Sequence, residues 1–114
     1  MDKGEKKMKP KKHYIKNKKH LEIQRTLVVS TAHITEDEDR ELREAPDTDY
    51  LLSVYSNEYF HSIYVPYTEK LKDFEKQVGK NILALLKIAK KHNCAYLKLD
   101  RDAVVYDDLP QFDW

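Results

Sequence analysis

The feature that most constrains the fold is an apolar stripe in residues 68–92. Apolar side chains recur there at spacings of three and four, which places them on one face of a helix. The stripe comprises Leu71, Phe74, Val78, Ile82, Leu85 and Ala89, with Leu86 and Ile88 widening it near the end. Thr68 is a suitable N-cap, and Asn93 suits a left-handed C-cap. A helix of this kind needs a second apolar layer to cover it.

Short segments rich in β-branched and aromatic residues can supply that second layer. Residues 27–29 predict a strand that is buried on both faces, and residues 95–99 alternate like a half-buried strand. Residues 50–55 and 59–65 predict two further strands joined by a hairpin-length connection. Residues 104–106 predict an additional edge strand.

A second, shorter helix is predicted to start at Thr35. Thr35 and Glu38 have the spacing of a capping box, in which each side chain bonds the other residue's backbone N–H. The acids of residues 36–39 then occupy the first turn, where the helix dipole favours negative charge. Pro46 ends this helix.

The resulting order is strand, helix, strand, strand, helix, strand. This is the split βαβ pattern, an α+β two-layer sandwich with an antiparallel sheet and both helices on one face. Residues 21–114 are predicted to form the single domain, and residues 1–20 a disordered lysine-rich arm. In such a sheet the first and last strands run antiparallel. His33 and Asp100, which follow these two strands, are therefore expected at opposite edges.

Charge divides the chain sharply. Residues 1–25 carry ten Lys and Arg against three acids, a net charge of +7, whereas residues 26–114 carry eleven against seventeen, a net charge of −6. Lysines in the arm can neutralise phosphates without reading sequence, or they can dock on an acidic surface. The candidates for nucleic-acid binding are Lys9, Lys11, Lys12, Lys16, Lys18 and Lys19.

His33 is the one candidate for catalysis, because it lies where the first strand gives way to a helix. A histidine at such a corner equally serves as a plain partner for backbone groups. Ser30 and Thr31 beside it lack the glycines of a nucleophile elbow. The only glycines are Gly4 and Gly79, so no glycine-rich phosphate loop is present.

Asp100 and Asp102 are the candidates for a metal site, because carboxylate oxygens bind divalent cations. With His33 as acid or base, they would suit a small metal-dependent enzyme acting on phosphodiesters. A solvated turn explains the same pair, since the spacing and the glycine of an EF-hand are missing. His92 and Cys94 have no second ligand pair, so zinc is not predicted, and no cofactor is expected.

Binding to a protein partner is predicted for two groups of side chains. They are the acids Glu36, Asp37 and Asp39 and the aromatics Tyr59, Phe60 and Tyr64. Tyrosine gives large contact areas at binding surfaces. An RNA-binding module that stacks bases on sheet aromatics is an alternative, although the glycines of its usual signature are absent. Phe112 and Trp114 are expected to lock the C-terminus onto the body.

The composition favours a soluble cytoplasmic protein. The single cysteine excludes an intramolecular disulfide. The longest apolar run, residues 82–86, is far shorter than the ~20 residues that span a bilayer. The N-terminus lacks the apolar region of a secretory signal. The oligomeric state stays open.

Two stretches resemble a small uncharacterised domain family carried on phages, plasmids and conjugative elements of gut bacteria. The first is Ser-Thr-Ala-His-Ile at 30–34, and the second contains the Asp100–Asp102 turn and the closing Asp113-Trp114. Relatives often have glycine after the second aspartate, where this chain has Ala103. The resemblance covers residues 26–114 and implies a mobile-element setting but no mechanism.

These observations together predict a non-enzymatic interaction protein of a mobile element. An anti-defence inhibitor of a CRISPR effector or a restriction enzyme fits this setting, because an acidic body can occupy a basic nucleic-acid channel. In this hypothesis the folded body contacts a protein partner, and the arm contacts nucleic acid or an acidic surface.

Overall fold

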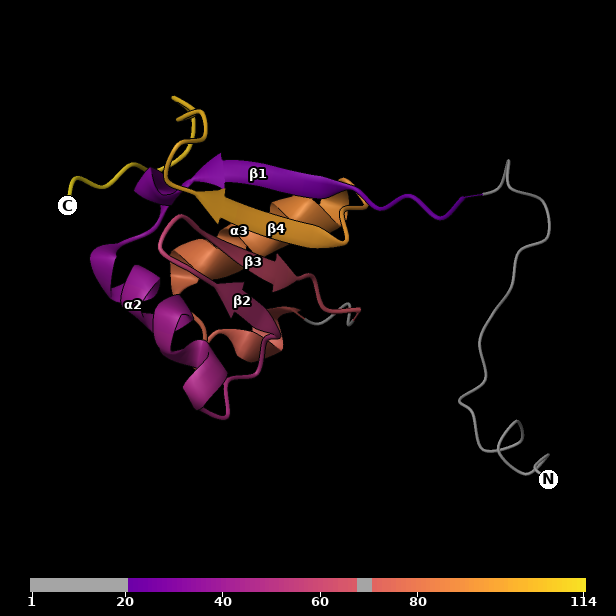
Figure 1. Cartoon of the computed structure of the whole chain (residues 1–114), viewed down its shortest axis with the longest axis horizontal. Coiled ribbons are helices and arrows are strands. Elements are labelled where there is room, and N and C mark those ends of the chain that lie inside the picture. The colour runs from indigo at the N-terminus through magenta and orange to yellow at the C-terminus, as the bar shows by residue number, and fades with distance from the viewer. Residues whose placement is uncertain (1–20, 68–70) are drawn as a thin grey trace, which may run out of the picture.

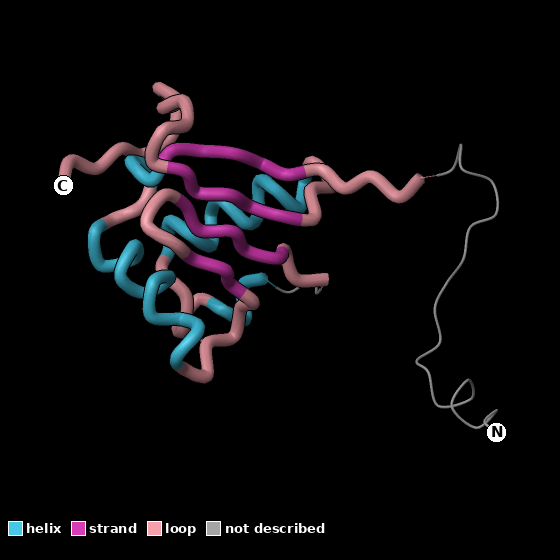
Figure 2. Tube along the Cα trace, viewed as in Figure 1, coloured by secondary structure: helices cyan, strands magenta, loops and turns pink. Residues whose placement is uncertain are grey.

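The computed structural model describes residues 21–67 and 71–114. The chain forms a four-stranded sheet with two helices against it (Figure 1). The strands are β1 (Thr26–Ser30), β2 (Val54–Ser56), β3 (Phe60–Tyr64) and β4 (Tyr96–Asp100), and the helices are α2 (Glu36–Glu44) and α3 (Lys80–Lys91). Short 3-10 turns occur at η1 (Thr31–His33), η2 (Ala45–Asp47) and η3 (Leu71–Phe74). This order confirms the predicted α+β class (Figure 2).

The sheet is mixed, with the strand order β1-β4-β3-β2. β1 runs parallel to β4, whereas β3 is antiparallel to both β4 and β2. The prediction of a purely antiparallel sheet, with antiparallel first and last strands, is therefore wrong. Patterns within each strand indicate burial but not pairing partners, which depend on where α3 returns the chain. Ser30 is level with Asp100, so the ends of both strands lie at the same edge.

Both helices pack on one face of the sheet, as predicted. Leu42 from α2 and Ile82 from α3 belong to the same buried cluster as Ile63, Leu97 and Leu99 from the strands. Full burial of each such side chain stabilises the fold by about 1.5–3 kcal/mol. In Figure 1, α3 passes behind the strands, and the face turned to the viewer is the one that no described helix covers.

The long helix is shorter than its apolar stripe predicts. α3 begins at Lys80, with Gly79 as its N-cap, and the earlier residues form η3 and turns. Leu71 and Val78 are nevertheless buried, so the apolar pattern correctly indicated buried positions but not a continuous helix. The predicted cap Thr68 lies outside the described residues. Asn93 has a φ of 59°, which confirms the left-handed position at the end of α3.

Two of the predicted strands also differ. β2 covers residues 54–56, so only residues 54 and 55 of the predicted 50–55 strand lie in it, and residues 104–106 form no strand. Tyr106 instead directs its backbone N–H to the ring of His33. Because this N–H is bonded to a side chain, it is not available for pairing with a neighbouring strand.

Glu38 joins the starts of both helices. Its Oε1 accepts a hydrogen bond from the Thr35 backbone at 2.8 Å, and Thr35 Oγ1 accepts from the Glu38 backbone at 3.1 Å, which confirms the capping box. The buried carboxylate also accepts the backbone N–H of Asn81 at 2.9 Å and its side-chain amide at 3.0 Å. One carboxylate therefore satisfies orphan donors at two helix N-termini.

Tyr50 secures the connection that follows α2. Its hydroxyl donates to Glu41 Oε2, which also accepts the Gly79 backbone N–H at 3.1 Å. Burial, followed by the hydrogen bond and the negative charge of Glu41, raises the pKa of Tyr50 well above its ordinary value. The phenol therefore stays protonated and continues to donate.

Gly79 is required by this capping arrangement because of the space it leaves. A Cβ atom there would lie 2.8 Å from Cδ of Glu38, closer than carbon atoms pack. Gly79→Ala is expected to lower the free energy of unfolding by about 1–3 kcal/mol, measured by urea denaturation.

The double variant Glu38→Ala/Gly79→Ala separates this clash from a general effect at the cap. Glu38→Ala removes the three atoms nearest to the added methyl group, so Gly79→Ala should lower the free energy of unfolding less in that background than in the wild type. Equal costs of Gly79→Ala in both backgrounds would contradict the packing argument.

Candidate functional site

The parallel pairing of β1 and β4 gathers the predicted chemical groups at one edge of the sheet. His33 follows β1 and Asp100 ends β4, and these strand ends are adjacent. The β2–β3 connection reaches the same edge, where Arg101 donates its backbone N–H to the Tyr59 carbonyl at 3.2 Å. The carboxyl edge of β1 and β4 is therefore the first candidate region.

His33 is buried, with 1% of its surface exposed, and both ring nitrogens contact backbone groups. Nδ1 lies 2.7 Å from the Pro110 carbonyl, and Nε2 accepts the Tyr106 N–H at 2.9 Å. This pairing requires a neutral ring with its proton on Nδ1. The C-terminal segment, residues 104–114, engages both ring nitrogens, so His33 is a partner for backbone groups.

The C-terminal segment is held at two further points. Phe112 donates its N–H to the Ala32 carbonyl at 2.8 Å, and the Trp114 indole N–H donates to the Ile34 carbonyl at 2.9 Å. Both acceptors flank His33 in the chain. The Trp114 indole therefore holds the terminus on the body as expected, whereas Phe112 contributes through its backbone N–H.

His33→Ala is expected to release this segment, because it leaves the Tyr106 N–H and the Pro110 carbonyl without partners. The free energy of unfolding should fall by about 2–3 kcal/mol. Trp114 is the only tryptophan, so its emission should shift to the red, and residues 104–114 should exchange amide hydrogens faster. His92→Ala, at an exposed histidine, is the control. Unchanged emission and exchange in His33→Ala would refute the role.

Asp100 and Asp102 form a turn in which the Asp100 carboxylate contacts neighbouring groups of the chain. Asp100 Oδ1 accepts the Asp102 N–H at 2.9 Å, and Oδ2 lies 3.7 Å from Lys98 Nζ. Within residues 21–67 and 71–114, no group of three or more His, Cys, Asp or Glu side chains is placed to hold a metal ion. Because His33 is turned toward the C-terminal segment, the predicted three-residue centre does not assemble.

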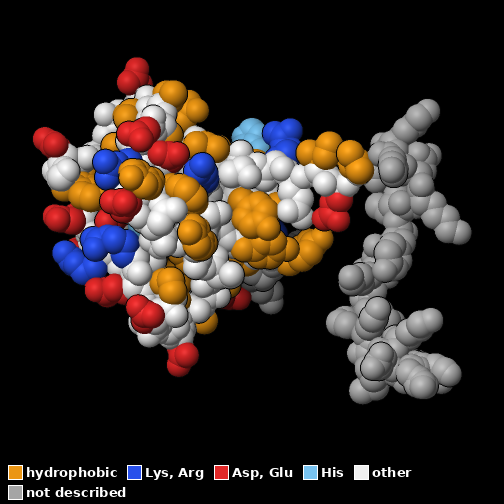
Figure 3. Space-filling view, viewed as in Figure 1, with side chains coloured by type: hydrophobic (Ala, Val, Ile, Leu, Met, Phe, Trp, Pro, Cys, Tyr) orange, Lys and Arg blue, Asp and Glu red, His pale blue; other side chains and the backbone are white. Residues whose placement is uncertain are grey.

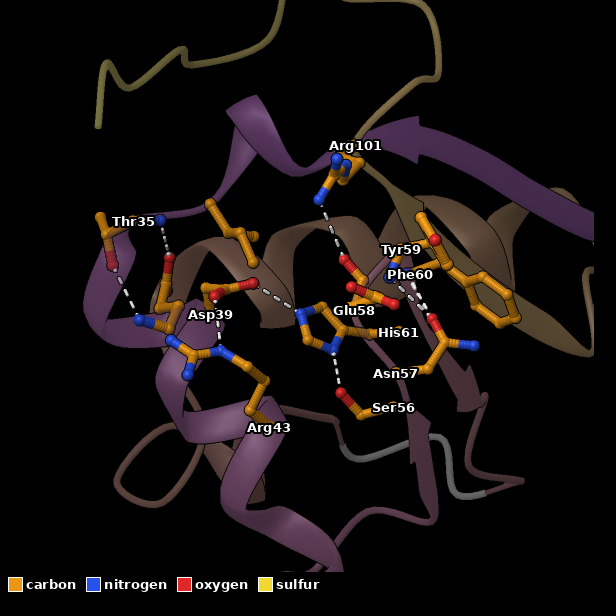
Figure 4. Close-up of polar contacts among 12 residues, drawn as sticks. Thr35, Asp39, Arg43, Ser56, Asn57, Glu58, Tyr59, Phe60, His61 and Arg101 are labelled. Atoms are coloured by element: carbon orange, nitrogen blue, oxygen red, sulfur yellow. Dashed lines mark hydrogen bonds and ion pairs between the residues drawn. The ribbon is translucent and has the colours of Figure 1, made fainter.

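A second histidine, which sequence reasoning missed, links the sheet to α2 (Figure 4). His61 Nε2 lies 2.6 Å from Asp39 Oδ1, and Nδ1 lies 2.7 Å from Ser56 Oγ. Arg43 Nε donates to the other Asp39 oxygen at 2.9 Å. The sequence signal that could have found it is the alternation of buried and outward positions along β3, which places His61 on the core side. His61 lies opposite Ser56 in the hairpin register.

The row of serine, histidine and aspartate has the composition of a nucleophilic triad. A cavity of about 300 Å³ adjoins it and is lined by Asp39 and His61 among others, but not by Ser56. His61 is buried, and both of its nitrogens are in use. The hydroxyl that would attack a substrate thus faces no substrate space, so the row acts as a clamp between the β2–β3 hairpin and α2.

Asp39→Asn is expected to lower the free energy of unfolding by about 2–4 kcal/mol, since it removes the negative partner of a buried ring. Ser56→Ala should cost only about 1 kcal/mol, because a single hydroxyl contact is lost. Asp37→Asn is the matched control, because the Asp37–Arg40 pair is exposed and contributes little. Equal losses for Asp37→Asn and Asp39→Asn in urea denaturation would contradict the clamp.

The cavity beside this clamp is lined by aromatic rings and by charged side chains of both signs, the acids being Asp39 and Glu58. Arg43 and Arg101 border it together with Tyr59, Phe60 and Trp114. The Arg101 guanidinium lies over the Tyr59 ring, 5.4 Å from its centroid. The two arginines and two carboxylates balance in charge, so planar groups are the ligands that such a lining accommodates.

The open face of the sheet is the second candidate region. Strand register places Tyr55, Phe60, Tyr64, Tyr96 and Lys98 on this face, opposite the core. Tyr55 is 62% exposed and Tyr64 is 41% exposed. Figure 3 shows hydrophobic side chains across this face and acidic ones gathered around its margin, over α2 and the C-terminal segment.

A family model described as "Family of unknown function (DUF5983) C-terminal domain" matches residues 26–114. The chain belongs to this family. The expected resemblance to an uncharacterised domain family is confirmed to that extent. Comparisons with curated proteins and with solved structures each found no match. In the described part of this DUF5983 domain, no helix is long and apolar enough to cross a membrane.

The predicted binding residues of the DUF5983 domain lie in different places. Glu36 and Asp37 are exposed on the first turn of α2, whereas Asp39 is engaged by His61 and Arg43. The aromatics divide between the cavity and the open face: Tyr59 and Phe60 line the cavity, and Phe60 and Tyr64 face outward from β3. The arm lysines Lys9, Lys11, Lys12, Lys16, Lys18 and Lys19 lie outside the described residues.

Proposed function

We propose that this protein is a non-enzymatic interaction protein that works through the open face of its sheet. The observation that carries the proposal is the aromatic surface formed by Tyr55, Phe60, Tyr64 and Tyr96. Leaving such rings in water forfeits the stabilisation that burial would bring, and exposed apolar patches of this kind mark binding sites. His33 and His61 both use their two ring nitrogens in contacts within the domain, so neither of them offers a ring nitrogen to a substrate.

The setting that we propose is a mobile genetic element, with a host defence complex as the target. The resemblance to domains of phages, plasmids and conjugative elements supports this setting. CRISPR effectors and restriction enzymes have basic channels for nucleic acid. The exposed acids Glu36 and Asp37, and those of the C-terminal segment, would complement such a channel.

A plating assay tests this function. The full chain, expressed in cells that carry a CRISPR or restriction system, should raise the plating efficiency of the targeted phage at least about tenfold. Tyr64→Glu places a charge on the open face and should abolish the gain. Ala84→Glu adds the same charge at an exposed position of α3 and should preserve the gain.

The level of folded protein must match among the three variants, which thermal melting and immunoblotting establish. A gain that survives in Tyr64→Glu would show that the open face is not the binding surface. Equal plating with and without the wild-type chain, across both kinds of system, would contradict the proposed anti-defence role.

A further inference from the structure

The cavity at the carboxyl edge of β1 and β4 is large enough for one planar ring system. Its volume of about 300 Å³ lies at the lower end of the range for small-ligand pockets. Tyr59, Phe60 and Trp114 line it, and Tyr59 is 53% and Trp114 49% exposed. Exposed rings beside a cavity gain apolar burial when a flat ligand stacks on them. The size and the lining therefore indicate a planar ligand.

Contacts within the chain hold this lining in place. Asn57 Oδ1 accepts the backbone N–H groups of Tyr59 at 2.8 Å and Phe60 at 2.9 Å (Figure 4). Arg101 donates its backbone N–H to the Tyr59 carbonyl at 3.2 Å and its Nη1 group to the Glu58 carbonyl at 3.3 Å. Side chains that are fixed in this way lose little further freedom when a ligand binds, so the site is preorganised.

Two of the four charged side chains in the lining engage each other. Asp39 accepts from Arg43 Nε at 2.9 Å, and its other oxygen contacts the His61 ring. The other two are Glu58 and Arg101. Within residues 21–67 and 71–114, no group forms an ion pair or a hydrogen bond with the Glu58 carboxylate. One carboxylate and one guanidinium are thus left for a ligand, and their charges cancel.

These two groups define the chemistry of the ligand. A carboxylate only accepts hydrogen bonds, and a guanidinium only donates them. The matching ligand is therefore uncharged and planar, with N–H donors along one edge for Glu58 and acceptors along the next edge for Arg101.

We infer that this cavity binds the guanine base of a nucleoside or nucleotide. Guanine is uncharged, and its ring N–H and amino group donate side by side, as the Glu58 carboxylate requires. Its O6 and N7 atoms accept a bidentate contact from arginine, which Arg101 can supply. Adenine has an amino donor in place of O6 and an acceptor in place of the ring N–H, so it mismatches both side chains. The inference concerns the cavity and does not depend on the open face.

Trp114 reports this binding, because it lines the cavity and is the only tryptophan. Titration of the full chain with guanosine monophosphate should change the Trp114 emission to a saturating value. The adenosine, cytidine and uridine monophosphates should bind at least about tenfold more weakly. Guanosine should bind as tightly as its monophosphate, since the balanced charges do not favour a phosphate. Thermal melting gives a second readout, because a bound ligand raises the melting temperature.

Glu58→Gln tests the contact that is specific for guanine. The variant keeps the size of the side chain but puts an amide, which has only one acceptor oxygen, where guanine needs two. Affinity for guanosine monophosphate should fall at least about tenfold, and affinity for adenosine monophosphate should not fall. Glu36→Gln, at an exposed acid of α2, is the matched control and should leave both affinities unchanged.

The stacking ring has its own test. Tyr59→Ala should weaken binding of guanosine monophosphate on the order of tenfold, whereas Tyr59→Phe should retain it, because stacking uses the ring. Tyr55→Ala removes an exposed ring of the open face that does not line the cavity, so it should leave this affinity unchanged.

Two results would overturn the inference. Equal affinities for the four monophosphates that persist in Glu58→Gln would show stacking without recognition of guanine. An unchanged Trp114 emission and an unchanged melting temperature at millimolar guanosine monophosphate would show that the cavity does not bind the base. The plating assay is independent of both results, because its variant Tyr64→Glu lies outside the cavity lining.

Discussion

The parallel pairing of β1 with β4 is the constraint on which the rest of the arrangement depends. It makes β4 a central strand and brings the ends of β1 and β4 together with the β2–β3 connection. It also brings the Arg25 end of the chain beside Tyr96. The cavity edge follows from this pairing, and the open face follows from the antiparallel pairing of β3 with β4 and β2.

Buried polar groups connect the layers at three points. Glu38 caps both helices, His61 ties the hairpin to α2, and His33 holds the C-terminal segment. Each of these groups is fully engaged, as buried polar atoms must be to avoid a desolvation penalty. The two histidines that resemble catalytic residues by type are therefore explained by structural contacts. Function is then best sought on the surface that these contacts leave uncovered.

Local signals predicted much of the fold. The capping box at Thr35 and the left-handed Asn93 follow from interactions that span few residues or from a side chain's own preferences. The start of α3 could not be predicted in this way, because Leu71 and Val78 are buried although they lie before the helix begins at Lys80. A spacing of three and four reports a buried face, and turns can supply such a face as well as a helix does.

The sequence alone determined the α+β class, the two-layer packing and the division of charge, because these depend on periodicity and composition within short segments. Tertiary structure alone decided that β1 lies beside β4, that His61 meets Asp39, and that Tyr55, Phe60, Tyr64 and Tyr96 share one open face. These contacts join residues far apart in the chain. Their formation depends on the collective packing of the core, which no single segment encodes.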